Sequence, residues 1–424
     1  MTFCGAKNTS LLAPPTKVAL GLTMLMATDQ QRQHLANQLT KMVNELVVGR
    51  NSGGVVNATV GIEVPGKNFI FTAAAGEARP DTGERMTGQH RYHWASITKT
   101  LTATLILQLA EEGLFGAGGI DTHLAKLLLF APEVMDRLHV MDGVSYGHKI
   151  TLRHLLSHTS GIKDAIVDDG SYTQSALGTF APNSFLGLLF DGTAPVLSPI
   201  VPWDPVRPNE PMAGMLNFYL NHHSIASTAL FPPGKAFHYS DTGFVILALL
   251  IEHITGMSLH ENLTKRIFSP LGMVDCYLAY RNDPVLGKNR QPESEIYAGN
   301  YAFLSSGLDL SFDWGGGGIV SSYCASNTFL KGLLTGKLFQ HNKTLEGMCQ
   351  WRLPKGLKPP RTGVGLGLFR TSYKGGELWG HSGAWGAKMA CDPEAGIYLA
   401  GSVNQVYADA NWHCPLIEAV KNAF

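Results

Sequence analysis

The sequence predicts an α+β protein. An antiparallel sheet is flanked by helices from both ends of the chain, and a mostly helical region is inserted into it. Three observations indicate this fold: residues 30–75 follow a helix–strand–strand pattern, residues 119–273 are mostly helical, and residues 377–424 return to short strands and a last helix. Since strand-forming segments occur at both ends, we expect both termini to contribute to one sheet.

The first elements are a helix and a hairpin. Residues 30–47 carry apolar side chains at helical spacing and end at the glycine-rich stretch 49–54, which predicts an amphipathic helix. Residues 55–64 and 68–75 then look like two strands, and the Pro65-Gly66 pair between them is typical of a turn.

Helices dominate the middle of the chain, and strands return near its end. Residues 96–114 are predicted to form a buried helix. The stretch 180–211 is rich in Pro, Gly and aromatic residues without a clear period. It is therefore interpreted as a lid or pocket wall, with a passive surface excursion as the alternative. Short runs between Gly or Pro turns predict strands at 377–380, 386–391 and 396–403, before a helix at 412–424.

This order of elements suggests a domain division. We expect residues 30–115 and 300–424 to form an α/β sheet domain, residues 116–299 a mostly helical domain, and residues 1–29 an N-terminal extension. The apolar run 18–27 lacks a convincing small-x-small cleavage site and is too short to span a bilayer. We therefore expect a soluble protein without a membrane span, and a cytoplasmic location is slightly favoured over export.

Composition excludes some partners. Lys plus Arg and Asp plus Glu both total 33, so the formal charge is zero, and no basic block is present that would follow a phosphate backbone. Nucleic acid is therefore not an expected partner. The six cysteines are scattered without a C-x-x-C pair, which argues against a zinc site and favours free thiols, with one or two disulfides left open.

The first motif with chemistry is Ser96-Ile97-Thr98-Lys99, at the head of a predicted helix. Residues at i and i+3 share a helix face, so the lysine amine can lie beside the serine hydroxyl. A serine hydroxyl is a weak nucleophile until a base takes its proton, and a helix N-terminus offers N–H groups to a developing oxyanion. Alone, the pattern is more often a helix cap with a solvated lysine.

Two further motifs lie far away in the chain. Tyr239-Ser240-Asp241 follows a Pro-Pro-Gly loop and precedes an apolar helix at 245–254, so its tyrosine can point into a cleft and move a proton. His381-Ser382-Gly383 lies at the junction of two predicted strands. An edge strand there would offer N–H groups to a bound carbonyl, and the glycine would let substrate approach closely.

Together, the S-x-x-K, Y-S-D and H-S-G motifs, in this order, resemble those of the serine β-lactamase and DD-peptidase superfamily. The nearest branch resembles its class C-like carboxylesterases, D-aminopeptidases and DD-carboxypeptidases. Four more blocks are similar to family segments, at residues 155–161, 267–273, 316–322 and 363–367. The resemblance covers the chain from about residue 30 to its end and implies the β-lactamase/transpeptidase-like fold.

The resemblance also implies roles. Ser96 would be the nucleophile, Lys99 its proton acceptor and electrostatic partner, and Tyr239 the general base and acid. The oxyanion hole would be formed by the backbone N–H groups of Ser96 and Ala384. The implied substrate-binding and oxyanion residues are Asp241, His381, Ser382, Gly383 and Ala384. His381 replaces the lysine of the K-T-G motif, as in peptidase- and esterase-like relatives.

Asp241 departs from the more frequent asparagine of the Y-x-N motif. An asparagine amide can donate a hydrogen bond to a substrate carbonyl, whereas an ionised aspartate can only accept one. We therefore expect Asp241 to disfavour acylamino β-lactams and to favour a free amine or a simple ester. The alternative is that Asp241 pairs with Lys99 and that specificity is determined elsewhere.

Other motifs carry less weight. Gly143-Val144-Ser145-Tyr146-Gly147 matches a nucleophile elbow, but the segment before it is too polar for a central strand. His154 and His158, one helical turn apart, and the His222-His223 pair lack a nearby carboxylate ligand and are interpreted as packed or solvated. Residues 315–318 do not match a dinucleotide fingerprint. They are interpreted as letting the backbone pass close to the active-site strand.

We therefore predict a serine hydrolase that cleaves an ester or amide bond of a small substrate through a Ser96 acyl-enzyme. The expected type is a carboxylesterase or a D-amino-acid peptidase or amidase. The alternatives are a β-lactamase or DD-carboxypeptidase, an acyltransferase, and a non-catalytic binding or sensor protein of the same fold. No metal or organic cofactor is implied, and the partner is a small ester or peptide-like molecule.

Overall fold

The fold is taken from a computed structural model of the 424-residue chain. It describes residues 29–49, 53–79, 81–168, 229–279, 293–307, 310–406 and 408–424, and the single positions 216, 219, 220 and 281. The stretch 180–211, interpreted above as a lid or pocket wall, the His222-His223 pair and the apolar run 18–27 lie outside the described residues.

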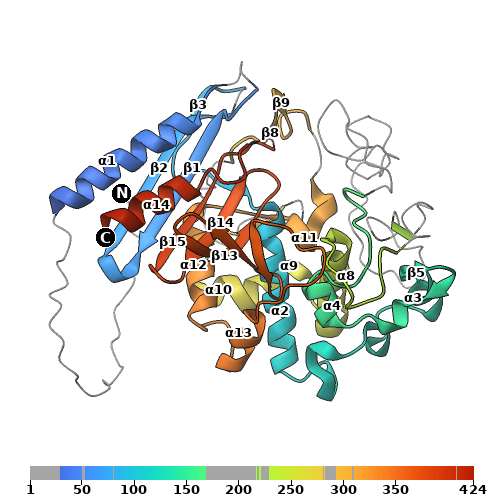
Figure 1. The fold of residues 1–424 in the computed structure, drawn as a ribbon. Coiled ribbons are helices and arrows are strands. Elements are labelled where there is room, and N and C mark those ends of the chain that lie inside the picture. The colour runs from blue at the N-terminus through green and yellow to red at the C-terminus, as the bar shows by residue number, and fades with distance from the viewer. Residues whose placement is uncertain are drawn as a thin grey trace, which may run out of the picture.

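One antiparallel sheet of eight strands dominates the structure (Figure 1), in the order β11-β12-β13-β14-β15-β1-β2-β3. Its strands are β1 Asn57–Val64, β2 Phe69–Arg79, β3 Glu84–Arg85, β11 Arg361–Val364, β12 Phe369–Tyr373, β13 Gly376–Ser382, β14 Ala387–Asp392 and β15 Ile397–Ser402. The first and last parts of the chain meet where β1 pairs with β15, with Val60 opposite Gly401. The predicted antiparallel sheet with strands from both ends is confirmed.

The remaining elements are helices and short strand pairs. The helices are α1 Asp29–Leu46, α2 Thr98–Glu111, α3 Pro132–Leu138, α4 Leu152–Leu156, α8 Asp241–Thr255, α9 Leu259–Leu263, α10 Ser269–Leu271, α11 Trp314–Gly317, α12 Tyr323–Leu334, α13 Asn342–Met348 and α14 Cys414–Ala423. The small sheets are formed by β4 Tyr92–His93, β10 Ile319–Ser321 and β7 Tyr277–Leu278, by β5 Val140–Met141 and β6 Val144–Ser145, and by β8 Tyr297–Ala298 and β9 Tyr301–Ala302.

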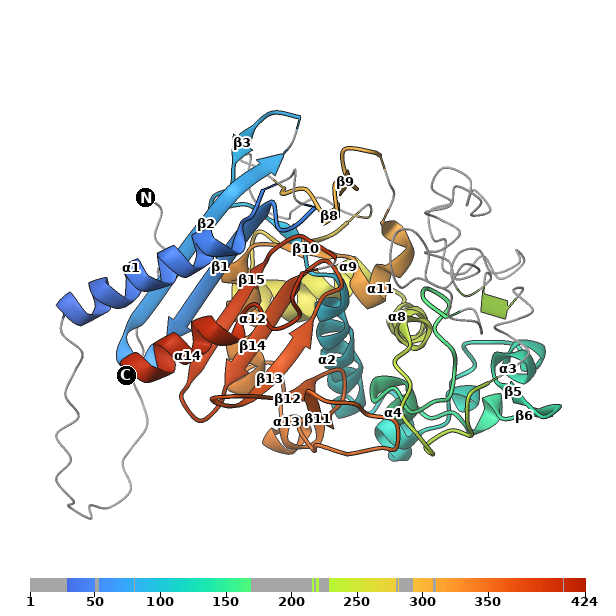
Figure 2. The same ribbon diagram turned by 45° about the horizontal axis from the view of Figure 1, so that its top comes forward.

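Helices α1 and α14 cover one face of the large sheet (Figure 2). Their apolar side chains, among them Leu39 and Ile417, are fully buried against alternate residues of β1 such as Val60 and Ile62. Alternation puts every second residue of a strand on the same face. The opposite face of β1 carries Gly61, where an added Cβ would lie 1.8 Å from the ring of Tyr323 in α12. Gly61 is therefore needed for α12 to pack on the second face.

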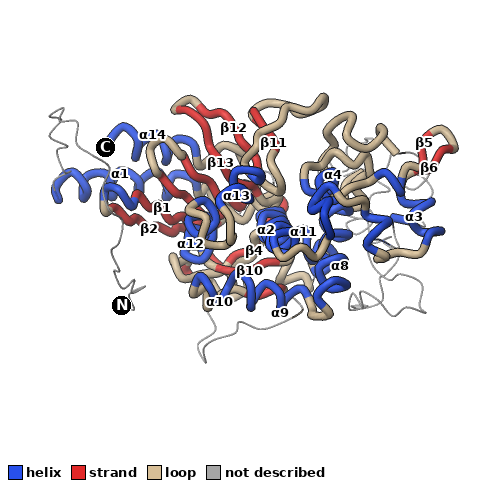
Figure 3. Tube along the Cα trace, turned by 90° about the horizontal axis from the view of Figure 1, so that it is seen from below, coloured by secondary structure: helices blue, strands red, loops and turns tan. Residues whose placement is uncertain are grey.

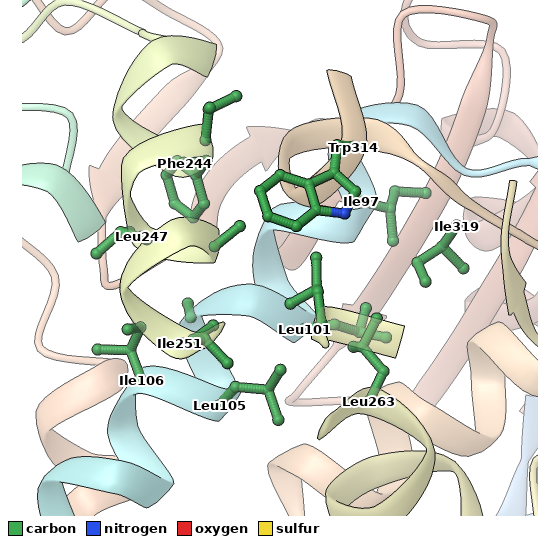
Figure 4. Packing of buried hydrophobic residues seen from close by; sticks show 14 of the residues in the cluster. Ile97, Leu101, Leu105, Ile106, Phe244, Leu247, Ile251, Leu263, Trp314 and Ile319 are labelled. Atoms are coloured by element: carbon green, nitrogen blue, oxygen red, sulfur yellow. The ribbon is translucent and has the colours of Figure 1, made fainter. Parts of the chain in front are cut away.

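Beyond that second face, α2 lies between the sheet and α8, with α11 beside both helices (Figure 3). Leu101 and Leu105 of α2 belong to the same buried cluster as Leu247 and Ile251 of α8 (Figure 4). Every residue of α8 from 241 to 251 is buried, in accord with a sequence that is mostly apolar on all sides of the helix rather than amphipathic. No single described helix is long and apolar enough to cross a membrane, although α8 together with the bent segment 259–271 would pass by length and composition alone.

Two details differ from the sequence-based expectation. The segment predicted as one helix from residue 96 begins with a 3-10 turn, Ala95–Ile97, and α2 itself begins at Thr98. Strands β11 and β12 were not predicted, because residues 361–373 contain several glycines and charged residues that mask the alternation of apolar side chains.

The G-x-S-x-G alternative is excluded by its surroundings. Ser145 lies in β6, which in the described part of the chain pairs with the two-residue strand β5 alone, and a 3-10 turn at Gly147–Lys149 follows it. A nucleophile elbow requires a buried strand before the serine and a helix directly after it. Ser145 therefore lacks the surroundings that a nucleophile elbow requires.

Candidate active site

Ser96 lies in the 3-10 turn that leads into α2. The preceding residue, Ala95, has a positive φ of 45°, a conformation that is uncommon for residues other than glycine. The turn is held from the other side, because the Trp94 N–H donates to the carbonyl oxygen of Ile319 at 2.8 Å. Ser96 itself is only partly buried, between a fully buried Trp94 and Ile97. It is thus a fixed and accessible hydroxyl at the start of a helix.

Lys99, one turn further along, is fully buried and contacts three groups. Its Nζ donates to Ser96 Oγ at 3.1 Å and to the carbonyl oxygen of Gly316 at 2.7 Å, and it forms an ion pair with Asp241 Oδ1. Burial alone would lower the pKa of Lys99, but the negative charge of its partner Asp241 contributes most to outweighing burial, and the net shift is upward. Lys99 is therefore an ammonium ion at neutral pH.

Tyr239 completes the group that the three motifs predicted. Its ring lies 5.2 Å from Lys99 Nζ and stacks on His158, with ring centroids 4.2 Å apart. The phenol hydroxyl is buried, and no described residue forms a hydrogen bond with it within the usual distance and angle limits. Lys99 and Ser96 nevertheless lie close enough to lower its pKa. Burial raises the pKa of Tyr239 and Lys99 lowers it, and the net shift is upward. Tyr239 is a neutral phenol at rest.

Asp241 is the first residue of α8, whose N-cap Ser240 accepts a hydrogen bond from the Gly243 N–H. Its carboxylate is largely buried and pairs with Lys99. Of the two possibilities that the sequence left open for Asp241, the structure thus contains the pairing with lysine. An oxygen engaged with Lys99 is less available to a substrate amine.

His381, Ser382 and Gly383 lie at the end of β13 and just beyond it. The expectation of an edge strand is wrong, because β13 has β12 on one side and β14 on the other. The last residue of β13 paired with β12 is Gly380, opposite Phe369. His381 and Ser382 therefore extend past β12, and one side of this short stretch is not used by the sheet.

Gly383 brings this strand end against the serine turn. A Cβ added at Gly383 would lie 2.4 Å from the Trp94 carbonyl oxygen and 3.1 Å from Ala95 Cβ. Only glycine permits such a close approach. Ala384, the predicted second oxyanion donor, is consequently held next to the turn that carries Ser96.

His381 is buried and neutral. Its Nδ1 donates to the Ser382 carbonyl oxygen at 2.8 Å, so Nε2 is left as an acceptor, and this atom has no partner among the described residues. Burial, with a smaller effect of Lys99, lowers the pKa of His381 to about 3. The lysine of a K-T-G motif would add a positive charge at this position, and His381 does not.

A hollow beside His381 has a basic lining that the sequence did not reveal. It includes Arg361, Ser382, Lys388 and His413. Lys388 is 8% exposed and donates to Ser382 Oγ at 2.9 Å. Neither Lys388 nor Arg361 forms an ion pair with a described carboxylate, and His413 Nδ1 is buried without a hydrogen-bond partner among the described residues. Burial lowers the pKa of Lys388 to about 8, and Arg361 adds to that shift.

Sequence reasoning also missed the support behind the site. His158 was interpreted as a packed histidine. It is packed, but its ring forms the surface on which Tyr239 stacks, and its Nδ1 accepts the Ser240 N–H at 3.1 Å. Asp164 and Asp313, both close to Asp241, carry no motif that would have singled them out. The glycine stretch at residues 315–318 lies beside the site, because the Gly316 carbonyl oxygen accepts a hydrogen bond from Lys99.

The described residues contain no group of three or more His, Cys, Asp or Glu side chains that could hold a metal ion. His154 Nδ1 accepts the Thr151 N–H within a helix cap.

Comparison with known proteins decides the family. The model of the family described as Beta-lactamase matches residues 32–413. The chain belongs to this family. Similar proteins with this fold include an esterase and a D-stereospecific amidohydrolase, and the chain shares the β-lactamase fold with them.

The relatives of this family member differ in what they act on. It is 26% identical over 211 residues to esterase EstB of Burkholderia gladioli, and this alignment covers 49% of this chain and 43% of that protein. It is also 26% identical to penicillin-binding protein 4* of Bacillus subtilis, over 51% of this chain and 37% of that protein. The chain thus spans less than half the length of these curated relatives.

Solved structures cover the family member almost completely. The D-stereospecific amidohydrolase of a Streptomyces species is 26% identical, with a TM-score of 0.64, and the alignment covers 90% of this chain and 98% of that one. The D-amino acid amidase of Ochrobactrum anthropi, solved with D-phenylalanine, has a TM-score of 0.66 at 22% identity and covers 92% and 100%. At 22% identity, the similarity to the D-amino acid amidase shows a shared fold alone.

Proposed function

We propose that the protein hydrolyses an ester or amide bond of a small substrate through an acyl-enzyme on Ser96. The observation that carries this proposal is the hydrogen bond between Lys99 Nζ and Ser96 Oγ inside a buried group that also contains Tyr239 and Asp241. A helical serine with an activating partner in hydrogen-bond reach is the arrangement that nucleophilic catalysis needs.

The protonation states suggest how the proton moves. Lys99 and Tyr239 are both protonated at rest, so neither can simply accept the Ser96 proton. Lys99 takes that proton while it passes one of its own to Asp241, and the serine oxygen bonds to the substrate carbonyl carbon. Tyr239 then donates its proton to the leaving oxygen or nitrogen and regains one from Lys99, which recovers it from Asp241.

Deacylation repeats these steps with water. Water replaces the leaving group, its proton follows the same route, and the Ser96 ester is cleaved to the free acid. The N–H groups of Ser96 and Ala384 are the proposed oxyanion donors in both steps, since Gly383 holds the strand end against the serine turn.

Small esters and D-amino-acid amides are the proposed substrate classes. Asp241 is paired with Lys99 and cannot donate to an acylamino carbonyl, and this disfavours acylamino β-lactams. The overlap with a D-stereospecific amidohydrolase and the similarity to an esterase support the same ranking.

A second candidate is a peptide-like substrate with a free carboxylate. The observation that favours it is the hollow with Lys388 and Arg361, two cations without a described carboxylate partner next to His381. A carboxylate placed there would offset the cost of their burial. Lys388 must be charged to bind it, so this preference should weaken as the pH rises through about 8.

A substrate panel tests both candidates. It contains short-chain p-nitrophenyl esters, D-alanine amide, a D-alanyl-D-alanine peptide and a chromogenic cephalosporin, and it is run on the wild type, Ser96→Ala and Lys388→Met. We expect turnover of esters or the amide that is lost in Ser96→Ala. Selective loss of the peptide in Lys388→Met would favour the second candidate. Turnover that survives Ser96→Ala would contradict the proposal.

A further inference from the structure

Two more carboxyl groups lie behind Asp241. Asp164 is in the segment after α4, and the N–H of its neighbour Ala165 donates to Thr242 Oγ1 at 2.9 Å, which fixes this segment against the first turn of α8. Asp313 ends a 3-10 turn just before α11. Asp164 and Asp313 thus come from two further segments and lie near Asp241, the carboxylate that pairs with Lys99.

The glycine stretch makes room for this arrangement. A Cβ added at Gly316 would lie 2.2 Å from Asp313 Oδ1 and 3.3 Å from Asp241 Oδ1, and one added at Gly317 would lie 1.9 Å from Asp313 Oδ2. The two carboxyl groups thus converge on the backbone that also binds Lys99 through the Gly316 carbonyl oxygen. Any side chain at these positions would separate them.

Each of the additional carboxyl groups has one oxygen without a partner. Asp164 Oδ1 accepts the Ile166 N–H at 2.9 Å, but Oδ2 is shielded from solvent and no described donor reaches it. Asp313 is partly exposed as a residue, yet its Oδ1 is shielded and unpartnered in the same way. Both groups lie within hydrogen-bonding reach of Asp241. Ionised carboxylates only accept hydrogen bonds, so such contacts form only if one member holds a proton.

The charges around the cluster point the same way. Lys99 pairs with Asp241, whereas burial lowers the pKa values of His158 and His381, so that neither ring adds a positive charge. The nearby Asp168 has hydrogen-bond donors of its own, namely the His238 ring and the Asp164 N–H. Three ionised carboxylates would leave the buried group with a large excess of negative charge, which is costly in a site of low polarity.

We propose that Asp164 and Asp313 are held as neutral carboxylic acids that each donate a hydrogen bond to ionised Asp241, so that Asp241 alone pairs with Lys99. They are positioning residues, because they act on Lys99 through Asp241 and touch no reacting atom. The proposal deepens the proposed function, since it takes the Ser96–Lys99 pair as the reactive one, but the charge state itself can be measured without substrate.

The expected pH behaviour follows from the same cluster. Burial and the charge of Asp241 raise the pKa of Asp164 well above its usual range, and burial raises the pKa of Asp313 to about 8. The folded protein therefore holds a proton on Asp313 that an unfolded chain releases near pH 4. Unfolding free energy should fall as the pH rises from about 4 to about 8, because the folded state binds more protons in that window.

Difference infrared spectroscopy of the full chain is the direct test. Protonated carboxyl groups absorb apart from carboxylates, and we expect such bands at pH 6 that diminish in Asp164→Asn and in Asp313→Asn. The Asp313 band should vanish on titration through about pH 8. Asp136→Asn, at an exposed aspartate, is the matched control and should leave these bands unchanged. No protonated carboxyl band at pH 6 in the wild type would overturn the proposal, whatever the activity.

Kinetics give the second arm. An asparagine amide can still donate to Asp241 and leucine cannot, so Asp164→Asn and Asp313→Asn should lose at most several-fold in kcat, and the leucine variants roughly a hundredfold. The activity of the wild type should fall above about pH 8, and the activity of Asp313→Asn should not show this fall. Equal losses in the asparagine and leucine variants, with an unchanged pH profile, would contradict the proposal. Failure of Ser96→Ala to abolish activity would refute the proposed function and leave the infrared result standing.

Discussion

Lys99 is the residue on which the site depends, because its neighbours come from three separate segments. Ser96 precedes it by one helical turn, Tyr239 and Asp241 come from the start of α8, and the Gly316 carbonyl oxygen comes from α11. A buried ammonium group with an ion pair and two further acceptors is well satisfied. The same contacts fix the position of the serine hydroxyl.

Lys99→Met should therefore destabilise the protein as well as inactivate it. Removal of the ammonium group leaves the carboxylate of Asp241 buried without its cation, which costs about 3–5 kcal/mol. The double variant Lys99→Met/Asp241→Asn should regain most of this stability, because it no longer buries a charge, but no activity. Urea unfolding followed by circular dichroism measures both variants. A single variant as stable as the wild type would show that the pair carries no such energy.

Tyr239→Phe should separate catalysis from stability. The ring stacks on His158 and is kept in the variant, while the lost hydroxyl forms no full hydrogen bond with the described residues. We expect kcat to fall by about 10²–10⁴-fold with a change in unfolding free energy of less than about 1 kcal/mol. Tyr301→Phe, at an exposed tyrosine, is the control. Wild-type kcat in Tyr239→Phe would remove the phenol from the mechanism.

At this scale the sequence was informative where a motif existed. Ser96, Lys99, Tyr239 and His381 were singled out by motif order and residue chemistry, and in the structure they lie close together. Asp164 could not be found in this way, because a lone aspartate in a loop gives no sign of which other carboxyl group the fold will bring beside it. That contact spans 77 positions of sequence to the start of α8.

Among the elements, the junction between β13 and the serine turn determines the geometry of the site. Gly383 allows the strand end to touch Trp94 and Ala95, and the β4–β10 pairing holds the turn from the other side, with His93 opposite Val320. A helix N-terminus and a strand end in contact give the N–H groups from which an oxyanion site can be built. The position of Ala384 follows from this contact.

Gly383→Ala should disturb this junction. The added Cβ would lie 2.4 Å from a backbone oxygen, so the strand must move, at a cost of about 1–3 kcal/mol. We expect kcat to fall while the KM of a small ester changes little. Gly347→Ala in α13 is the matched control, since no atom lies within 4 Å of its added Cβ and a helical alanine stabilises by about 0.5–1 kcal/mol. A Gly383→Ala enzyme with unchanged kcat would argue against this junction as the oxyanion site.

Element prediction succeeded where the periodicity was strong. The helix at 30–47 and the hairpin around Pro65-Gly66 were predicted to within a few residues, because their apolar spacing is regular. The place of β13 inside the sheet was not predicted. It depends on β11 and β12, whose short sequences, separated by glycines, lack a clear alternation of apolar side chains.

The whole molecule has two apolar layers on the two faces of one sheet. The layer formed with α1 and α14 lies on the face away from α2, and among the described residues it shares no buried side chain with the cluster around α2 and α8. The two faces differ in role: α2, α8 and α11 carry the reactive groups, and the outer helices bury the other face of β1 and its neighbours. Stability and catalysis should therefore respond separately to substitutions in the two layers.

Leu39→Ala tests this separation. Leu39 of α1 is fully buried in the outer layer, and its truncation should cost about 2–5 kcal/mol. At temperatures where the variant remains folded, kcat and KM should match the wild type within about twofold, since no contact of the reactive group changes. A large drop in kcat at full folding would show that the two layers are coupled.

The central claim is that Ser96 forms the covalent bond with substrate. The most direct measurement is intact-protein mass spectrometry after reaction with a fluorophosphonate, followed by identification of the modified peptide. We predict one adduct per chain, on Ser96, absent in Ser96→Ala and slowed in Lys99→Met and Tyr239→Phe. An adduct on another serine, or equal labelling of Ser96→Ala, would contradict the account.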